Sequence, residues 1–150
     1  MKNQEKEIQA INKLIEINND RVQGYKTASD ETDHGDLKQL FSKYNQQSSQ
    51  FASELSARVA SLGGKPETGT TTSGKVYRAW MDVKAAISNK ERKAILNSCE
   101  FGEDAALSAY RTVLEDNDIP VETRQLLDKQ HMELKRAHDE VKSLRDSQVA

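Results

Sequence analysis

The sequence predicts an all-α protein built as an antiparallel four-helix bundle. Three observations lead to this fold class. Apolar residues recur every three or four positions over long segments, as on the buried face of a helix. Helix-favouring Ala, Glu, Lys, Gln and Leu fill these segments. The two prolines of the chain, Pro66 and Pro120, lie between the segments rather than within them. The chain has 150 residues, which suffices for one core, so we expect a single domain over residues 1–150.

The first two long helices are expected over residues 4–29 and 36–62. The first has these apolar residues at helical spacing: Ile8, Ile11, Ile15, Val22 and Tyr25. The polar run over residues 30–36 indicates a tight turn between the two helices. Gly63 suits the end of the second helix, and Pro66 prevents its continuation. The two helices should therefore form an antiparallel hairpin.

The connection that follows is longer than a helical hairpin needs. Residues 67–73 have no apolar anchor, so we expect them to be the internal segment most sensitive to proteases. A short helix is expected over residues 74–87, where Trp80 and Met81 would pack it onto the bundle. One long crossover between two tight hairpins is the connectivity of ferritin-like bundles.

The last two long helices are expected over residues 89–116 and 120–145. Ser88 is a candidate N-cap for the first of them, and Glu91 three residues later completes a capping box. Pro120 suits the first turn of the last helix, because the missing N–H is not needed there.

Composition argues against two classes of partner. The formal net charge is −2, and the charged residues, 31% of the chain, have the two signs interleaved, so no basic stripe for nucleic acid stands out. No segment approaches the roughly 20 apolar residues that cross a bilayer, so we expect no membrane partner. Cys99 is the one cysteine and cannot form an internal disulfide, and the N-terminus has no apolar signal region. We therefore predict a cytoplasmic protein.

Each long helix has one polar residue in the middle of its apolar arc when successive residues are turned by 100°. These residues are Asn18, Ser48, Glu103 and Gln130. Each lies about three to four helical turns from the loop of its hairpin, and a hairpin pairs residues that are equally far from its loop, so the four should share one layer. We interpret the layer as a hydrogen-bonded structural network. On this interpretation Glu103→Gln should cost about 1–2 kcal/mol, and Glu103→Ala about 2–4 kcal/mol.

The alternative interpretation is a metal site. A carboxylate-bridged di-iron centre takes a Glu from each of two helices and Glu-x-x-His from each of the other two. The first two helices offer no inward carboxylate or histidine, so the candidates for a reduced iron or zinc site are Glu100, Glu103, His131 and His138. We otherwise expect no cofactor, and we predict no catalytic or cofactor-binding residue, because no nucleophile–base triad or phosphate-binding loop is recognisable.

Several segments resemble one known family. They are INKLIEINNDR at 11–21, SQF at 49–51, LGGKP at 62–66, RAW at 78–80, CEFGEDAA at 99–106 and AHD at 137–139. Together they are similar to a bacterial ferritin-like family, domain of unknown function 2383. The resemblance implies a ferritin-like bundle in a bacterial protein and, through some relatives, an association with stress responses. It implies no activity and no catalytic residues.

These observations favour a non-enzymatic, stress-associated cytoplasmic bundle protein that forms a homodimer. Two alternatives remain open. One is a metal-binding protein or oxidase that uses the reduced site. The other is a protein-interaction module that presents the crossover over residues 64–87.

Overall fold

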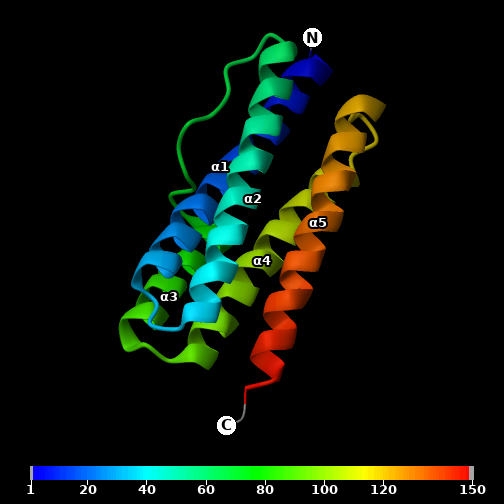
Figure 1. Cartoon of the computed structure of the whole chain (residues 1–150). Helices are drawn as coiled ribbons and strands as arrows, with labels where there is room; N and C mark the ends of the chain where they lie inside the picture. The colour runs from blue at the N-terminus through cyan, green and yellow to red at the C-terminus, as the bar shows by residue number, and fades with distance from the viewer. Residues whose placement is uncertain (1, 149–150) are drawn as a thin grey trace.

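The computed structural model describes residues 2–148, which contain five helices joined by turns and one long crossover (Figure 1). They are α1 (Lys2–Glu31), α2 (Gly35–Ser61), α3 (Gly74–Asn89), α4 (Arg92–Leu114) and α5 (Val121–Asp146). Helices α1 and α2 form one antiparallel hairpin, and α4 and α5 form the other (Figure 1). No strand occurs among the described residues. The predicted all-α, ferritin-like four-helix bundle with a crossover helix is therefore confirmed.

The crossover returns the chain along the side of the bundle before α3 packs against α1 and α4 (Figure 1). Polar contacts from α1 hold it in place. The backbone N–H of Glu67 donates to Asn12 Oδ1 at 2.8 Å, and Asn19 Nδ2 donates to the carbonyl of Gly69 at 2.9 Å. The Asp20 carboxylate accepts from the backbone N–H of Thr71 at 3.2 Å and from its hydroxyl. Burial raises the pKa of Asp20. The linker thus lacks an apolar anchor but has three polar ones.

The junction between α3 and α4 differs from the prediction. Helix α3 continues to Asn89, so Ser88 lies inside it and does not cap α4. Lys90 ends α3 with a left-handed backbone (φ 60°), and its N–H donates to the carbonyl of Ile87. Helix α4 consequently begins at Arg92 rather than at residue 89. The other predicted helix ends lie within two residues of those observed.

Arg92 ties the start of α4 to the start of α2. Its Nη1 and Nη2 donate to Asp36 Oδ1 and Oδ2 at 2.8 and 2.5 Å. This hydrogen-bonded pair lowers the pKa of Asp36 to about 2. The contact closes the end of the bundle at which the chain passes from α3 into α4.

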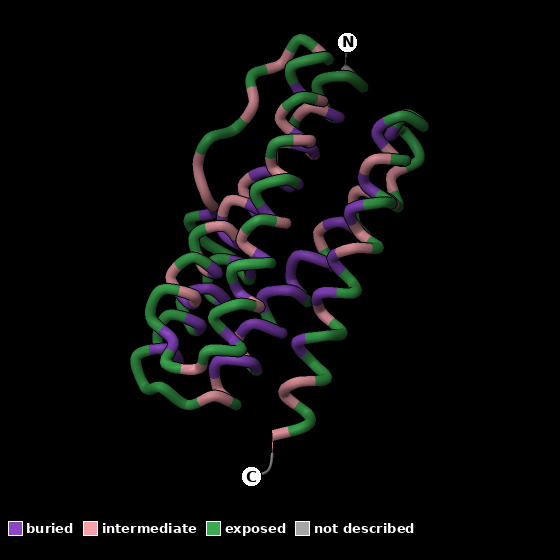
Figure 2. Tube along the Cα trace, viewed as in Figure 1, coloured by how far each residue is buried: buried purple, intermediate pink, exposed green. Residues whose placement is uncertain are grey.

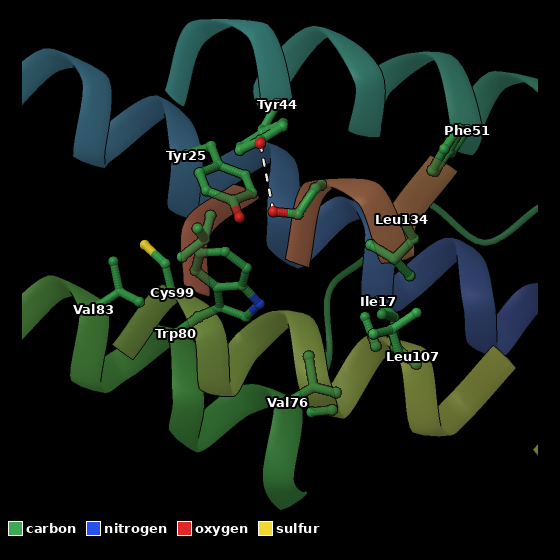
Figure 3. Packing of buried hydrophobic residues seen from close by; sticks show 14 of the residues in the cluster. Ile17, Tyr25, Tyr44, Phe51, Val76, Trp80, Val83, Cys99, Leu107 and Leu134 are labelled. Atoms are coloured by element: carbon green, nitrogen blue, oxygen red, sulfur yellow. Dashed lines mark hydrogen bonds between the residues drawn. The ribbon is translucent and has the colours of Figure 1, made fainter. Parts of the chain in front are cut away.

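The core is a continuous apolar cluster to which all five helices contribute, and the buried positions of each helix face inward (Figure 2). Trp80 docks α3 onto this core and lies edge-on to Tyr25, with 4.9 Å between the ring centroids (Figure 3). Its indole lies against Gly24 of α1, where a Cβ atom would collide with the ring, and against Gly102 of α4, where a Cβ atom would be packed tightly at 3.0 Å from it. Met81 is 46% exposed, so of the two predicted docking residues only Trp80 packs inward.

Candidate functional site

The four polar residues predicted for the bundle interior are all fully buried, at 0% exposure. They do not all bond to one another. Ser48 donates to the carbonyl of Tyr44, one turn earlier on its own helix, at 2.7 Å. The other three, Asn18, Glu103 and Gln130, belong to one hydrogen-bonded network that also contains residues absent from the prediction.

Arg21 of α1 is at the centre of this network and has an exposure of 0%. Its Nε donates to Glu103 Oε1 at 2.9 Å, and its Nη2 donates to Oε2 at 3.2 Å. The Tyr25 hydroxyl also donates to Glu103 Oε1, at 2.8 Å. Arg21 makes two further bonds, to Asn18 Oδ1 at 3.2 Å and to Gln47 Oε1 at 2.8 Å. Both carboxylate oxygens of Glu103 are therefore occupied by hydrogen-bond donors from α1.

A second arm crosses the rest of the bundle. Asn18 Nδ2 donates to the Tyr110 hydroxyl at 2.8 Å. The Tyr110 hydroxyl donates in turn to Gln130 Oε1 at 2.7 Å. Gln130 Nε2 in turn donates to Glu54 Oε1 at 3.0 Å. Through these bonds the network joins α1, α4, α5 and α2. We call the whole set the polar network; its members are Asn18, Arg21, Tyr25, Gln47, Glu54, Glu103, Tyr110 and Gln130.

Electrostatics favour a charged guanidinium at the centre. Burial disfavours the cation, but the Glu103 carboxylate, together with the nearby Tyr25 and Tyr110 side chains, outweighs that cost and raises the pKa of Arg21. Burial also raises the pKa of the Tyr25 and Tyr110 hydroxyls, so both remain neutral donors. The network is thus a buried ion pair whose fully buried neighbours are neutral hydrogen-bonding groups, with the half-buried Glu54 at the end of the second arm.

A di-metal centre does not fit these residues. Such a centre needs a carboxylate from each of the four long helices and a histidine from two of them. At this level helix α1 offers Asn18 and Arg21, and α2 offers Gln47 and Ser48. The one carboxylate that α2 contributes to the network, Glu54, lies about two turns after Gln47 and accepts from Gln130. Both oxygens of Glu103 already accept from donors. A buried guanidinium would also repel a second cation.

A second cluster lies where α4 faces α5. Glu100 and Asp104 of α4 and His138 of α5 each offer one ligand atom, and these atoms all lie within 4.8 Å of one another. His138 Nε2 is 2.7 Å from Asp104 Oδ1 and 3.7 Å from Glu100 Oε1. Arg145 Nη1 donates to the other oxygen of Glu100, and Asp139 Oδ1 is 3.0 Å from His138 Nδ1. We call Glu100, Asp104 and His138 the α4–α5 cluster.

The four predicted metal candidates therefore lie in three separate places. Glu100 and His138 come together in the α4–α5 cluster, whereas Glu103 is paired with Arg21. His131 lies about two turns before His138 on α5 and is not in the cluster. Burial lowers the pKa of His131, so its ring favours the neutral form. The prediction did not include Asp104, although it is one turn after Glu100 on the same face.

Comparison with known proteins places the chain in a family. The family model described as domain of unknown function (DUF2383) matches residues 6–116. The chain belongs to this family. The DUF2383 match includes Arg21 and Glu103, while Gln130 and His138 lie beyond it.

The fold of this DUF2383 protein is similar to that of a mutant of Mycobacterium smegmatis Dps1. The TM-score is 0.76 at 16% sequence identity, over 96% of this chain and 97% of the other. At this identity the likeness concerns the fold. No match was found among curated proteins. None of the helices within residues 2–148 is long and apolar enough to cross a membrane.

Proposed function

We propose that this DUF2383 protein is a non-enzymatic, stress-associated bacterial protein of the cytoplasm, in which the polar network takes the place of a di-metal centre. The bundle is on this view a structural or binding protein rather than an oxidase. The observation that carries the proposal is the buried pair of Arg21 and Glu103, joined by two hydrogen bonds.

A buried guanidinium supplies what a metal ion would otherwise supply to Glu103. It compensates the carboxylate charge and satisfies both oxygens without a change in oxidation state. Oxidase chemistry in a bundle core needs carboxylates that are free to bind metal, and Glu103 is not free. Cytoplasmic location is supported by Cys99, which is buried and unpaired, as in proteins of reducing compartments.

Iron content tests this proposal most directly. The full chain, purified without an affinity tag, should carry well under one equivalent of iron, and Glu103→Gln should leave that content unchanged. Glu115→Gln, at the exposed glutamate that directly follows α4, is the matched control. Close to two iron equivalents per chain, lost in Glu103→Gln but kept in Glu115→Gln, would overturn the proposal.

Homodimer formation is part of the same proposal. Phe101 of α4 and Met132 of α5 are 62% and 58% exposed, which leaves apolar surface for a second copy. Sedimentation equilibrium should give twice the chain mass. A monomer at all concentrations, with or without Phe101→Glu, would contradict this part alone.

A further inference from the structure

The α4–α5 cluster combines a histidine and two carboxylates from facing helices. Glu100 and Asp104 are four residues apart on α4, so both side chains point to the same side. His138 of α5 approaches them, with its side chain 13% exposed. Its Nε2 atom is inaccessible to solvent and has no hydrogen-bond partner among residues 2–148. Asp104 Oδ1 lies 2.7 Å away, but off the direction of a hydrogen bond.

The other side of the imidazole is well satisfied. His138 Nδ1 lies 3.0 Å from Asp139 Oδ1 with hydrogen-bond geometry, and Lys135 Nζ donates to Asp139 Oδ2 at 3.1 Å. A proton on Nδ1 therefore bonds to Asp139 and leaves the Nε2 lone pair facing two carboxylates. Metal-binding histidines commonly have this arrangement, because a carboxylate on one ring nitrogen orients the other toward the ion.

We propose that Glu100, Asp104 and His138 bind one divalent transition-metal ion of the zinc class. A nitrogen and two carboxylate oxygens are ligands that zinc accepts, with water in the fourth position. Zinc bonds of about 2.0–2.2 Å in a tetrahedron place ligand atoms about 3.3–3.6 Å apart. The observed separations from Nε2, 2.7 and 3.7 Å, lie on either side of this value. Small side-chain rotations would bring the three atoms to the required spacing.

The surroundings fit a single ion with access from solvent. Arg145 holds Oε2 of Glu100, which leaves Oε1 as the one ligand atom of that carboxylate. The Asp104 side chain is 53% exposed, so an ion and its water can enter from that side. The competing account is a protonated His138 in ion pairs with Asp104 and Asp139. That account predicts no affinity for metal.

Calorimetric titration decides between the two accounts. The untagged full chain, first treated with a chelator, should bind one Zn²⁺ per chain and gain a higher melting temperature. Asp104→Asn removes an exposed ligand with little risk to folding, and should weaken Zn²⁺ binding at least tenfold. His138→Gln should do the same. Asp128→Asn, at an exposed aspartate of α5 outside the cluster, is the matched control and should bind normally.

Three results would overturn the proposal. One is the absence of Zn²⁺ binding at millimolar concentration. Another is binding that Asp104→Asn and His138→Gln leave unchanged. The third is Mg²⁺ bound as tightly as Zn²⁺, which would indicate a general acidic patch. The readout does not involve Glu103, so failure here leaves the iron test of the polar network unaffected, and the reverse also holds.

Discussion

Replacing Glu103 by glutamine removes the carboxylate that neutralises a fully buried arginine. The amide keeps one acceptor oxygen, but its NH₂ group faces N–H donors of Arg21, where the second carboxylate oxygen accepted a bond. The neutral acceptors of Asn18 and Gln47 remain. They do not compensate the charge. Removing one partner of a buried ion pair costs about 3–5 kcal/mol, more than the 1–2 kcal/mol expected from the sequence without Arg21.

The double variant Arg21→Met with Glu103→Gln separates charge from shape. It leaves no unpaired charge, so it should be more stable than Glu103→Gln alone, although the lost bonds to Asn18 and Gln47 keep it below the parent. Urea unfolding followed by circular dichroism gives the free energies. At about 2–4 °C per kcal/mol for this size, Glu103→Gln should lower the melting temperature by about 6–20 °C. The reasoning would be refuted if Glu103→Gln lost less than about 1 kcal/mol of unfolding free energy, or if the double variant were less stable than both Glu103→Gln and Arg21→Met alone.

Three further predictions concern the crossover and the bundle end. Gly24→Ala should destabilise the protein by about 1–3 kcal/mol, because its Cβ would overlap the α3 indole; an unchanged urea midpoint would contradict this. Asp20→Ala should speed limited proteolysis within residues 67–73, whereas first cleavage inside α2 or α4 would show that the linker is held otherwise. The Asp36 carboxyl should titrate near pH 2 by NMR, so its stabilising contribution is complete above about pH 4 and disappears toward pH 2; Arg92→Gln should return that pKa to the ordinary range.

Helical periodicity predicted the fold because it reports burial directly. Apolar spacing located the four long helices, and Pro66 and Pro120 marked two of the breaks. The α3–α4 junction was predicted too early in the chain because serine is a common N-cap residue and Ser88 was taken as the cap. The chain instead turns at Lys90, in a left-handed conformation that is usual for glycine, and no glycine stands there to indicate it. A local capping motif does not show whether packing will end the helix at a different residue nearby.

The polar network was only partly predictable. Turning α1 by 100° per residue places Arg21 beside Asn18, so the helical geometry alone puts Arg21 on the inward face. An arginine is seldom fully buried without a partner, however, so its burial could not be inferred. That partner, Glu103, is on another helix, and sequence spacing gives no distance between helices. Tyr25 was counted among the apolar residues of its helix, although its hydroxyl donates a hydrogen bond to Glu103. Asp104 was missed for the same reason, because its proximity to His138 is a distance between two helices.

The Arg21–Glu103 pair also constrains how the chain folds. The two residues are 82 positions apart, and each belongs to a different hairpin. The α1–α2 hairpin on its own would have to bury a cation without a counterion, and the α4–α5 hairpin an anion. Neither hairpin can therefore complete its core before the crossover brings the other into place. The two halves should fold and unfold as one cooperative unit, with this long-range contact among the last to form.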